Sequence, residues 1–180
     1  MARETYSAFA ARMVAQAQSE HDVRVDLEAE ILRLANSYRI SQGQPMLKPD
    51  LENVNAARAH AMDMMLHHFM GHVASTGHDF ESRMRALRPD VMVLPRMAEN
   101  AVGQNHAGEA TAAVAAKLFQ LWIKSPAHRE ALVSLDYVHA ATGVVAKNGA
   151  VYIDMIFVGP QLTTNMNMNS AVPAATKGLY

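Results

Sequence analysis

The chain has 180 residues, of which 50% are apolar and 18% are charged, and its 16 basic and 17 acidic side chains leave a formal net charge of −1. This balance supplies enough apolar material for one packed domain, excludes a chain kept unfolded by its charge, and argues against nucleic-acid binding. No apolar run approaches the roughly 20 residues of a membrane span. The absence of cysteine leaves the cellular compartment open.

The first 25 residues are polar and rich in alanine, and we treat residues 1–25 as an N-terminal extension that is either helical or flexible. They lack the basic segment and the apolar stretch of a signal peptide. Either a leader has been removed or the chain stays inside the cell.

Two helices are predicted next, because apolar residues recur at helical spacing. The first runs from Asp26 to a stop at Gly43 and Pro45, with an apolar face made of Leu27, Ile31, Leu34, Ala35 and Tyr38. The second follows Asp50 and closes at Gly71, with a mainly apolar face made of Leu51, Val54, Arg58, Met62, Met65 and Phe69.

The middle of the chain predicts three short helices and one strand. Asp79 is a suitable N-cap for a helix whose face carries Phe80, Met84 and Leu87. We expect a short buried strand at 91–94 and a loop around 103–108. A further helix is predicted from the spacing of Ala110, Val114, Leu118, Leu121 and Trp122. Ser125 and Pro126 then begin a new helix over 127–133.

A β-hairpin is the clearest local prediction. Residues 141–146 and 150–158 flank Asn148 and Gly149, a pair that accommodates the positive φ angles of a type I′ turn. Beyond Pro160 the polar segment 161–180 is predicted to be a tail. Helices that precede an antiparallel hairpin favour an α+β fold built in layers.

The order of five short motifs resembles the bacterial branch of the CAP superfamily, the cysteine-rich secretory, antigen 5 and pathogenesis-related 1 proteins. Trp122-Ile-Lys-Ser-Pro-Ala-His128-Arg129 is the most specific of them. The others are Asn36-Ser-Tyr-Arg39 before Gly43 and Leu47, Gly71-His72, the Phe-x-x-Arg segment from Phe80 to Leu87 with Ala98-Glu99-Asn100-Ala101, and the closing strands 142–145 and 152–159.

This resemblance covers roughly residues 26–159, and it implies a CAP (SCP-like) domain over 26–160. The implied fold is a three-layer α/β/α sandwich with a mainly antiparallel central sheet and an open central cleft. It also implies export from a bacterial cell. We expect the cleft to be lined by His72, Glu99, Asn100, His128 and Asp154.

The imidazoles of His72 and His128 are the candidate metal ligands, since nitrogen and oxygen donors suit Zn²⁺ or another divalent cation. Glu99 is either a third ligand or a general base. The family's second acidic residue has no evident counterpart, and Asp154 is a candidate substitute. The alternative is that both histidines only tie loops together through hydrogen bonds that Glu99 accepts.

Other residues suggest rival sites that the sequence does not favour. His68 and His72 lie four residues apart, but Phe69 stands where a zincin metalloprotease requires glutamate. Clustered methionines such as Met62 and Met64 indicate core packing more than a soft-metal site. Arg39 and Arg129 are candidates to anchor buried carboxylates, with a solvent-facing position equally open for Arg129.

Three functions remain open at this point. The first is an extracytoplasmic binding module for a lipid, a peptide or another small apolar envelope ligand, with a metal in its cleft. The second is a zinc-dependent hydrolase that uses His72, His128 and Glu99. The third is a non-catalytic scaffold for protein interactions.

Overall fold

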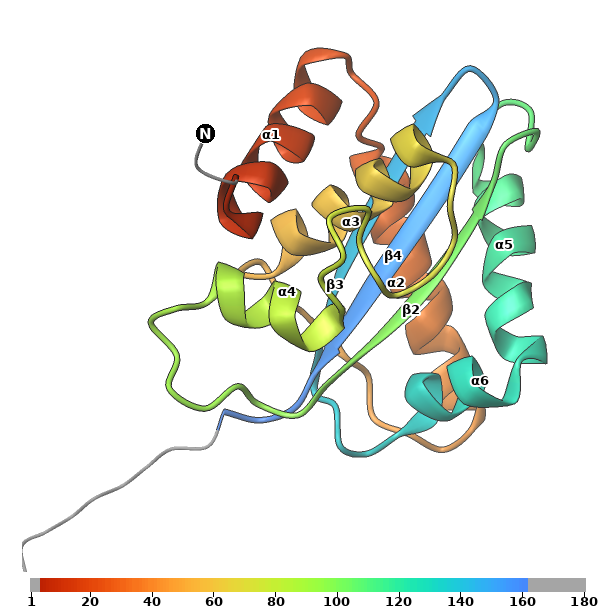
Figure 1. Ribbon diagram of the computed structural model, residues 1–180. Coiled ribbons are helices and arrows are strands. Elements are labelled where there is room, and N and C mark those ends of the chain that lie inside the picture. The colour runs from red at the N-terminus through yellow and green to blue at the C-terminus, as the bar shows by residue number, and fades with distance from the viewer. Residues whose placement is uncertain (1–3, 162–180) are drawn as a thin grey trace, which may run out of the picture.

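A mixed four-stranded sheet of order β1-β3-β4-β2 forms the centre of the protein, in a computed structural model that describes residues 4–161 (Figure 1). Its strands are β1 (Lys48–Pro49), β2 (Met97–Gln104), β3 (His139–Lys147) and β4 (Ala150–Val158). The antiparallel pairs β3–β4 and β4–β2 make up most of the sheet, and only the short β1 runs parallel to β3.

Helices cover both faces of this sheet, which confirms the predicted α/β/α sandwich (Figure 1). One face carries α2 (Val25–Ser41), α5 (Ala112–Lys124) and α6 (Pro126–Val133). The other carries α3 (Val54–His67) and α4 (Phe80–Leu87), with α1 (Tyr6–Ser19) packed outside α3. Alternate residues of β4 face the two layers, as the pleat of a strand requires.

The closest approach between layers lies where α3 crosses β3. A side chain at Gly143 would collide with the backbone of Ala57 and Arg58 in α3. The facing helix is lined with small buried residues, Ala56, Ala57, Ala59 and Ala61. Glycine on the strand and alanine on the helix therefore let the two backbones touch, and this contact fixes the height of α3 above the sheet.

Most predicted elements are confirmed, including the hairpin, in which Asn148 and Gly149 have φ angles of 50° and 83°. The Asp79 side chain accepts a hydrogen bond from the Ser82 amide at the start of α4. The helix after Asp50 is shorter than predicted: Leu51 is exposed before its start, and its last turn ends in the left-handed residue His68.

The predicted strand at 91–94 is wrong. Met92 is 95% exposed in this segment, which has no neighbouring strand to pair with, and the strand begins instead at Met97. Within the predicted extension 1–25, α1 is a helix with Tyr6, Phe9 and Met13 buried against α3. The predicted tail 161–180 lies, apart from Gln161, outside the described residues.

The outer edge of β3 is covered at both ends by other parts of the chain. Residues 22–24 bond to it near the hairpin, where the Arg24 amide donates to the Val144 carbonyl and Val23 bridges to Val145. β1 covers the other end. Within the described range, no helix has the combined length and hydropathy of a membrane span.

Candidate functional site

His72 and Glu99 are in direct contact although they are 27 residues apart. His72 lies in the loop between α3 and α4, and Glu99 points from β2 toward the same face of the sheet. The Nδ1 atom of His72 is 2.9 Å from Oε2 of Glu99. Because an ionised carboxylate can only accept, Nδ1 carries a proton, and in the neutral form of the ring Nε2 keeps its lone pair. The His72 side chain is 50% exposed.

His128 approaches the same place from the opposite layer. It lies near the start of α6, where its backbone carbonyl accepts a hydrogen bond of 3.0 Å from the side chain of Asn100. The ring centroids of His128 and His72 are 6.4 Å apart. We call His72, His128 and Glu99 the histidine site.

The loop that carries His72 is held by three buried side chains. Nε2 of His60 lies 2.8 Å from the Gly71 carbonyl, and Arg83 donates to the His72 carbonyl at 3.2 Å. Asp63 accepts hydrogen bonds from both the amide and the hydroxyl of Ser75. The position of the His72 ring therefore depends on α3 and α4 as well as on Glu99.

The two rings lie slightly farther apart than a shared zinc ion would hold them. Two imidazoles bound at tetrahedral angles, 2.0–2.1 Å from each nitrogen, place their centroids roughly 5–5.5 Å apart. The centroids of His72 and His128 are 6.4 Å apart, so the rings would approach each other by about 1 Å on binding. Burial lowers the pKa of His128 and keeps its ring neutral, whereas the hydrogen bond to Glu99 raises the pKa of His72. A carboxylate behind a ligating histidine is the usual way to orient its ring.

Glu99 is buried and hydrogen-bonded, so its carboxylate is not free to react with a water molecule. Its side chain is 1% exposed, and Oε1 accepts a hydrogen bond of 2.5 Å from the fully buried Arg83. Against the effect of burial, the hydrogen bond from His72 and the charge of Arg83 lower the pKa of Glu99. This arrangement favours an orienting role over that of a metal ligand or a general base.

Behind Glu99 lies a buried polar cluster, which we define as His60, Arg83, Glu99 and Asp154. Asp154 has no exposed surface, and neither of its carboxylate oxygens has a hydrogen-bond partner among the described residues. Burial raises the pKa of Asp154 well above its usual range, and the charge of Glu99 raises it further. Burial also lowers the pKa of His60.

His60, Glu99 and Asp154 could hold a metal ion, because one ligand atom from each lies within 4.8 Å of the others. In this inner group Glu99 is already neutralised by Arg83. A cation there would have to compete with that guanidinium. Among residues 4–161, no cationic side chain forms an ion pair or a hydrogen bond with the ring of His72 or His128.

The remaining candidates of the sequence have other surroundings. The backbone of His68 adopts the left-handed conformation just after α3 ends, so His68 does not share a helix face with His72. Arg39 is fully buried but donates to backbone carbonyls of Pro45, Leu132 and Ser134, so its predicted role as a carboxylate anchor is wrong. Arg129 is exposed, and Met62 and Met64 are core residues.

Arg83 and His60 were not predicted as site residues, although Arg83 is the arginine of the Phe-x-x-Arg motif. Arg83 follows Phe80 by three residues and precedes Leu87 by four, which places a charge on the apolar face of α4. A charged residue on an apolar helix face indicates a buried arginine, and a buried arginine needs a polar partner. His60 stands among alanines on α3, and nothing in its local sequence sets it apart.

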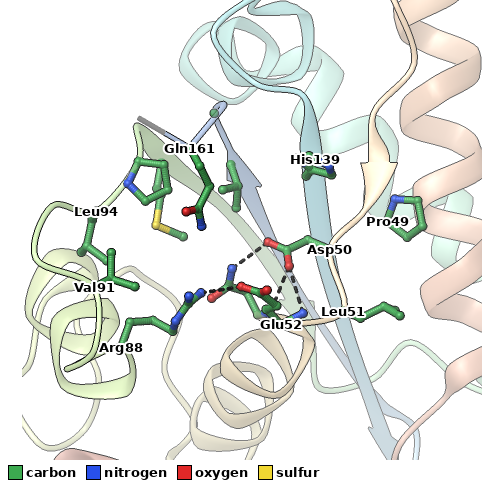
Figure 2. Close-up of a pocket in the computed structure, with 14 residues that line it drawn as sticks. Pro49, Asp50, Leu51, Glu52, Arg88, Val91, Leu94, His139 and Gln161 are labelled. Atoms are coloured by element: carbon green, nitrogen blue, oxygen red, sulfur yellow. Dashed lines mark hydrogen bonds and ion pairs between the residues drawn. The ribbon is translucent and has the colours of Figure 1, made fainter. Parts of the chain in front are cut away.

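A cavity of about 330 Å³ lies elsewhere, between the start of α3 and the segment 88–97 (Figure 2). Asp50, Glu52 and Arg88 point into it, and Arg88 pairs with Glu52 at 2.9 Å. None of the five predicted cleft residues lines this cavity. The histidine site therefore lies outside this cavity.

A curated relative and several solved structures resemble the chain. The uncharacterized membrane protein YlbC of Bacillus subtilis is 28% identical over 125 residues, which span 69% of this chain and 33% of that protein. An extracellular SCP-domain protein of Bacillus anthracis has a TM-score of 0.60 at 18% identity, over 75% of this chain and 41% of its own. An outer surface protein of Borrelia burgdorferi has a TM-score of 0.63 at 14% identity, over 76% of this chain and 95% of its own.

The chain thus spans about a third of the curated relative that it matches, and the structural likenesses at this identity establish the fold alone. A family model matches residues 32–159, well over half of the chain, and its description is the cysteine-rich secretory protein family. Since the fold, the bacterial neighbours and this model agree, the chain belongs to the CAP superfamily as a bacterial member of the cysteine-rich secretory protein family.

Proposed function

We propose that the chain is an extracytoplasmic binding module whose His72 and His128 side chains hold a divalent metal ion, with zinc as the best match. The observation that carries the proposal is the His72 ring, which the buried Glu99 fixes through Nδ1 and which lies 6.4 Å from the His128 ring. Bound through their neutral forms, two imidazoles would leave further coordination positions of zinc open.

A ligand of the module would be recognised at those open positions. When bound, the ion would supply a Lewis-acid site for a carbonyl or carboxylate oxygen of the ligand. His72 and His128 would hold the ion, Glu99 would orient His72, and Arg83 would keep Glu99 ionised. The lipid, peptide and envelope ligands considered from the sequence all carry such oxygens.

An extracytoplasmic location is supported by the names of similar proteins. The Bacillus anthracis neighbour is described as extracellular and the Borrelia burgdorferi neighbour as an outer surface protein. An envelope location would give the chain access to peptides and lipids outside the cytoplasm.

The test is a calorimetric titration of the full chain with zinc. We expect one ion per chain, and we expect His72→Ala and His128→Ala each to weaken binding by at least about tenfold, as loss of one ligand should. His67→Ala is the matched control, because this half-exposed histidine at the end of α3 pairs with Asp63 instead. Zinc binding that survives both site substitutions but is lost in His60→Ala would assign the metal to the inner group and contradict the proposal.

A further inference from the structure

The outer edge of β2 runs beside the histidine site and is the open edge of the sheet. β2 is the last strand in the order β1-β3-β4-β2. Within residues 4–161, no backbone-to-backbone hydrogen bond reaches its outer side. An open edge offers a row of N–H donors and C=O acceptors to another extended chain.

The hairpin register determines which residues of β2 point outward. In a two-residue hairpin the flanking residues, Lys147 and Ala150, bond to each other, so every second residue of β4 from Ala150 faces β3. The residues between them face β2, where they pair with Ala98, Asn100, Val102 and Gln104. The main-chain groups that remain turned outward belong to Met97, Glu99, Ala101 and Gly103.

One side-chain hydrogen bond agrees with this assignment. Nε1 of Trp122, on α5, donates to the Ala101 carbonyl at 3.1 Å, which a carbonyl used in the β2–β4 ladder would not need. The Glu99 carbonyl and the Ala101 amide, which neighbour this bond along the same edge, have no partner in the described backbone.

These groups can be reached from solvent. Glu99 as a residue is 8% exposed while its side chain is 1% exposed, so almost everything that solvent reaches of Glu99 is main chain. Gly103 is half-buried, with the ring of Tyr152 packed against it, and Ala101 is 8% exposed.

Exposed apolar side chains occur in the segments on both sides of the sheet. Val73, which follows His72 in sequence, is 53% exposed, and Leu121, which precedes Trp122, is 50% exposed. Side chains of an extended peptide alternate between the two faces of a sheet. One set would therefore meet the His72 loop, and the other set would meet α5 and α6.

We propose that the ligand of this module is an extended peptide segment with apolar side chains, which adds to the sheet as a strand along β2. The proposal rests on the proposed function, because Glu99 both heads the open edge and orients His72, so the bound peptide lies against the histidine site. Trp122 already occupies the Ala101 carbonyl, and the remaining outward amides and carbonyls alternate along one line, as the backbone of an added strand requires. A lipid chain cannot satisfy them.

The experiment follows backbone amide signals of the isotope-labelled full chain, in the presence of zinc, during titration with a pool of randomised, end-capped octapeptides. We expect shifts confined to β2 and its flanks, with slower hydrogen exchange at the amides of Ala101 and Gly103. A second pool, N-methylated on alternate residues, keeps one pairing edge and should still bind. A third pool, N-methylated throughout, has no donors left and should not bind.

Ala101→Pro removes one outward N–H and leaves the β4 ladder intact, which proline tolerates only at an edge. It should weaken peptide binding by about tenfold, the effect of one lost hydrogen bond, while zinc binding and the melting temperature stay unchanged. Ala101→Ser keeps the N–H and is the matched control. If the proline variant does not fold, the methylated pools test the same donors without altering the protein.

The outcomes separate this proposal from the one before it. Peptide binding without zinc binding would support strand addition along β2 and contradict the proposed metal site. Zinc binding with no response to any pool, or equal binding of the fully methylated pool, would overturn the edge proposal alone. A dimer that protects the β2 amides without added peptide would also overturn it, by assigning the edge to a second copy of the chain.

Discussion

Asp154 lies inside the protein beside one cation and one anion that already balance. Arg83 and Glu99 form an ion pair with no exposed guanidinium surface, so a second ionised carboxylate would leave the buried polar cluster with excess negative charge. A buried charge without a partner is costly. Burial, and then the charge of Glu99, raise the pKa of Asp154 well above its usual range, so the folded protein keeps the carboxyl proton to a higher pH than the unfolded chain does.

This state predicts how Asp154→Asn behaves with pH. Because the folded pKa of Asp154 lies above the value of 3.8 for the free group, the folded protein keeps a proton that the unfolded chain releases. The free energy of unfolding of the wild type must then fall as pH rises from about 4 through the folded pKa. The asparagine variant has no such proton, so its stability relative to wild type should grow with pH, to about 1–3 kcal/mol at neutrality.

Urea denaturation at several pH values measures this difference. Asp90→Asn, at an exposed position, is the matched control and should track the wild type. If Asp154→Asn were less stable than wild type by a constant amount at all pH values, Asp154 would be ionised and paired in a way that its orphaned oxygens do not indicate.

At the same scale, sequence motifs found the outer residues of the site and missed the inner ones. His72, Glu99 and His128 each belong to a short motif, and the structure brings all three together. Arg83 is the arginine of the Phe-x-x-Arg motif, but the motif alone does not place it in the site, and His60 belongs to no motif. Their position behind the outer residues depends on how α3 and α4 pack.

At the scale of elements, the contact between α3 and β3 depends on Gly143, which has no side chain to separate the two backbones. Gly143→Ala would place a methyl group against the backbone of Ala57 and Arg58, and neither layer can rotate out of the way. We expect a loss of about 3 kcal/mol in the free energy of unfolding, the scale of overpacking in a close-packed core.

Gly103→Ala is the informative comparison for this substitution. Its new methyl group would meet the ring of Tyr152, a side chain that can shift. Thermal and denaturant unfolding should rank Gly143→Ala as clearly more damaging. Equal losses for the two variants would mean that the α3 backbone yields as easily as a side chain.

The elements also show where prediction from the sequence fails. The hairpin was predictable because Asn148 and Gly149 encode its turn locally, and the helices were predictable from spacing and caps. β2 was missed because its residues do not alternate between apolar and polar. Glu99 and Asn100 are both buried, on opposite faces, for reasons that lie in the tertiary structure.

At the scale of the whole molecule, α1 extends the structure beyond the range of the family model. That model begins at residue 32, whereas Tyr6, Phe9, Met13 and Val14 of α1 are buried in a cluster with α3. α3 in turn carries His60 and Asp63, which hold the His72 loop. The N-terminal helix therefore supports the histidine site from two layers away.

Removal of residues 1–20 should disrupt cooperative folding. Four large buried side chains at about 1.5–3 kcal/mol each approach the entire stability of a typical domain. We expect a broadened, low-temperature melt by circular dichroism and loss of zinc binding in calorimetry. Phe9→Ala should give an intermediate loss of about 3–5 kcal/mol, and the exposed Arg12→Ala should be close to wild type. A sharp wild-type melt after the truncation would show that α1 is dispensable.

The sheet has different chemistry at its two borders, and this asymmetry limits how the molecules can assemble. β3 is capped by residues 22–24 and by β1, while β2 is left with unpaired groups in the described part of the chain. Growth of a fibre by strand addition requires each unit to offer one border and accept at another. Because the β3 border is covered at both ends, strand addition at β2 stops after a single step.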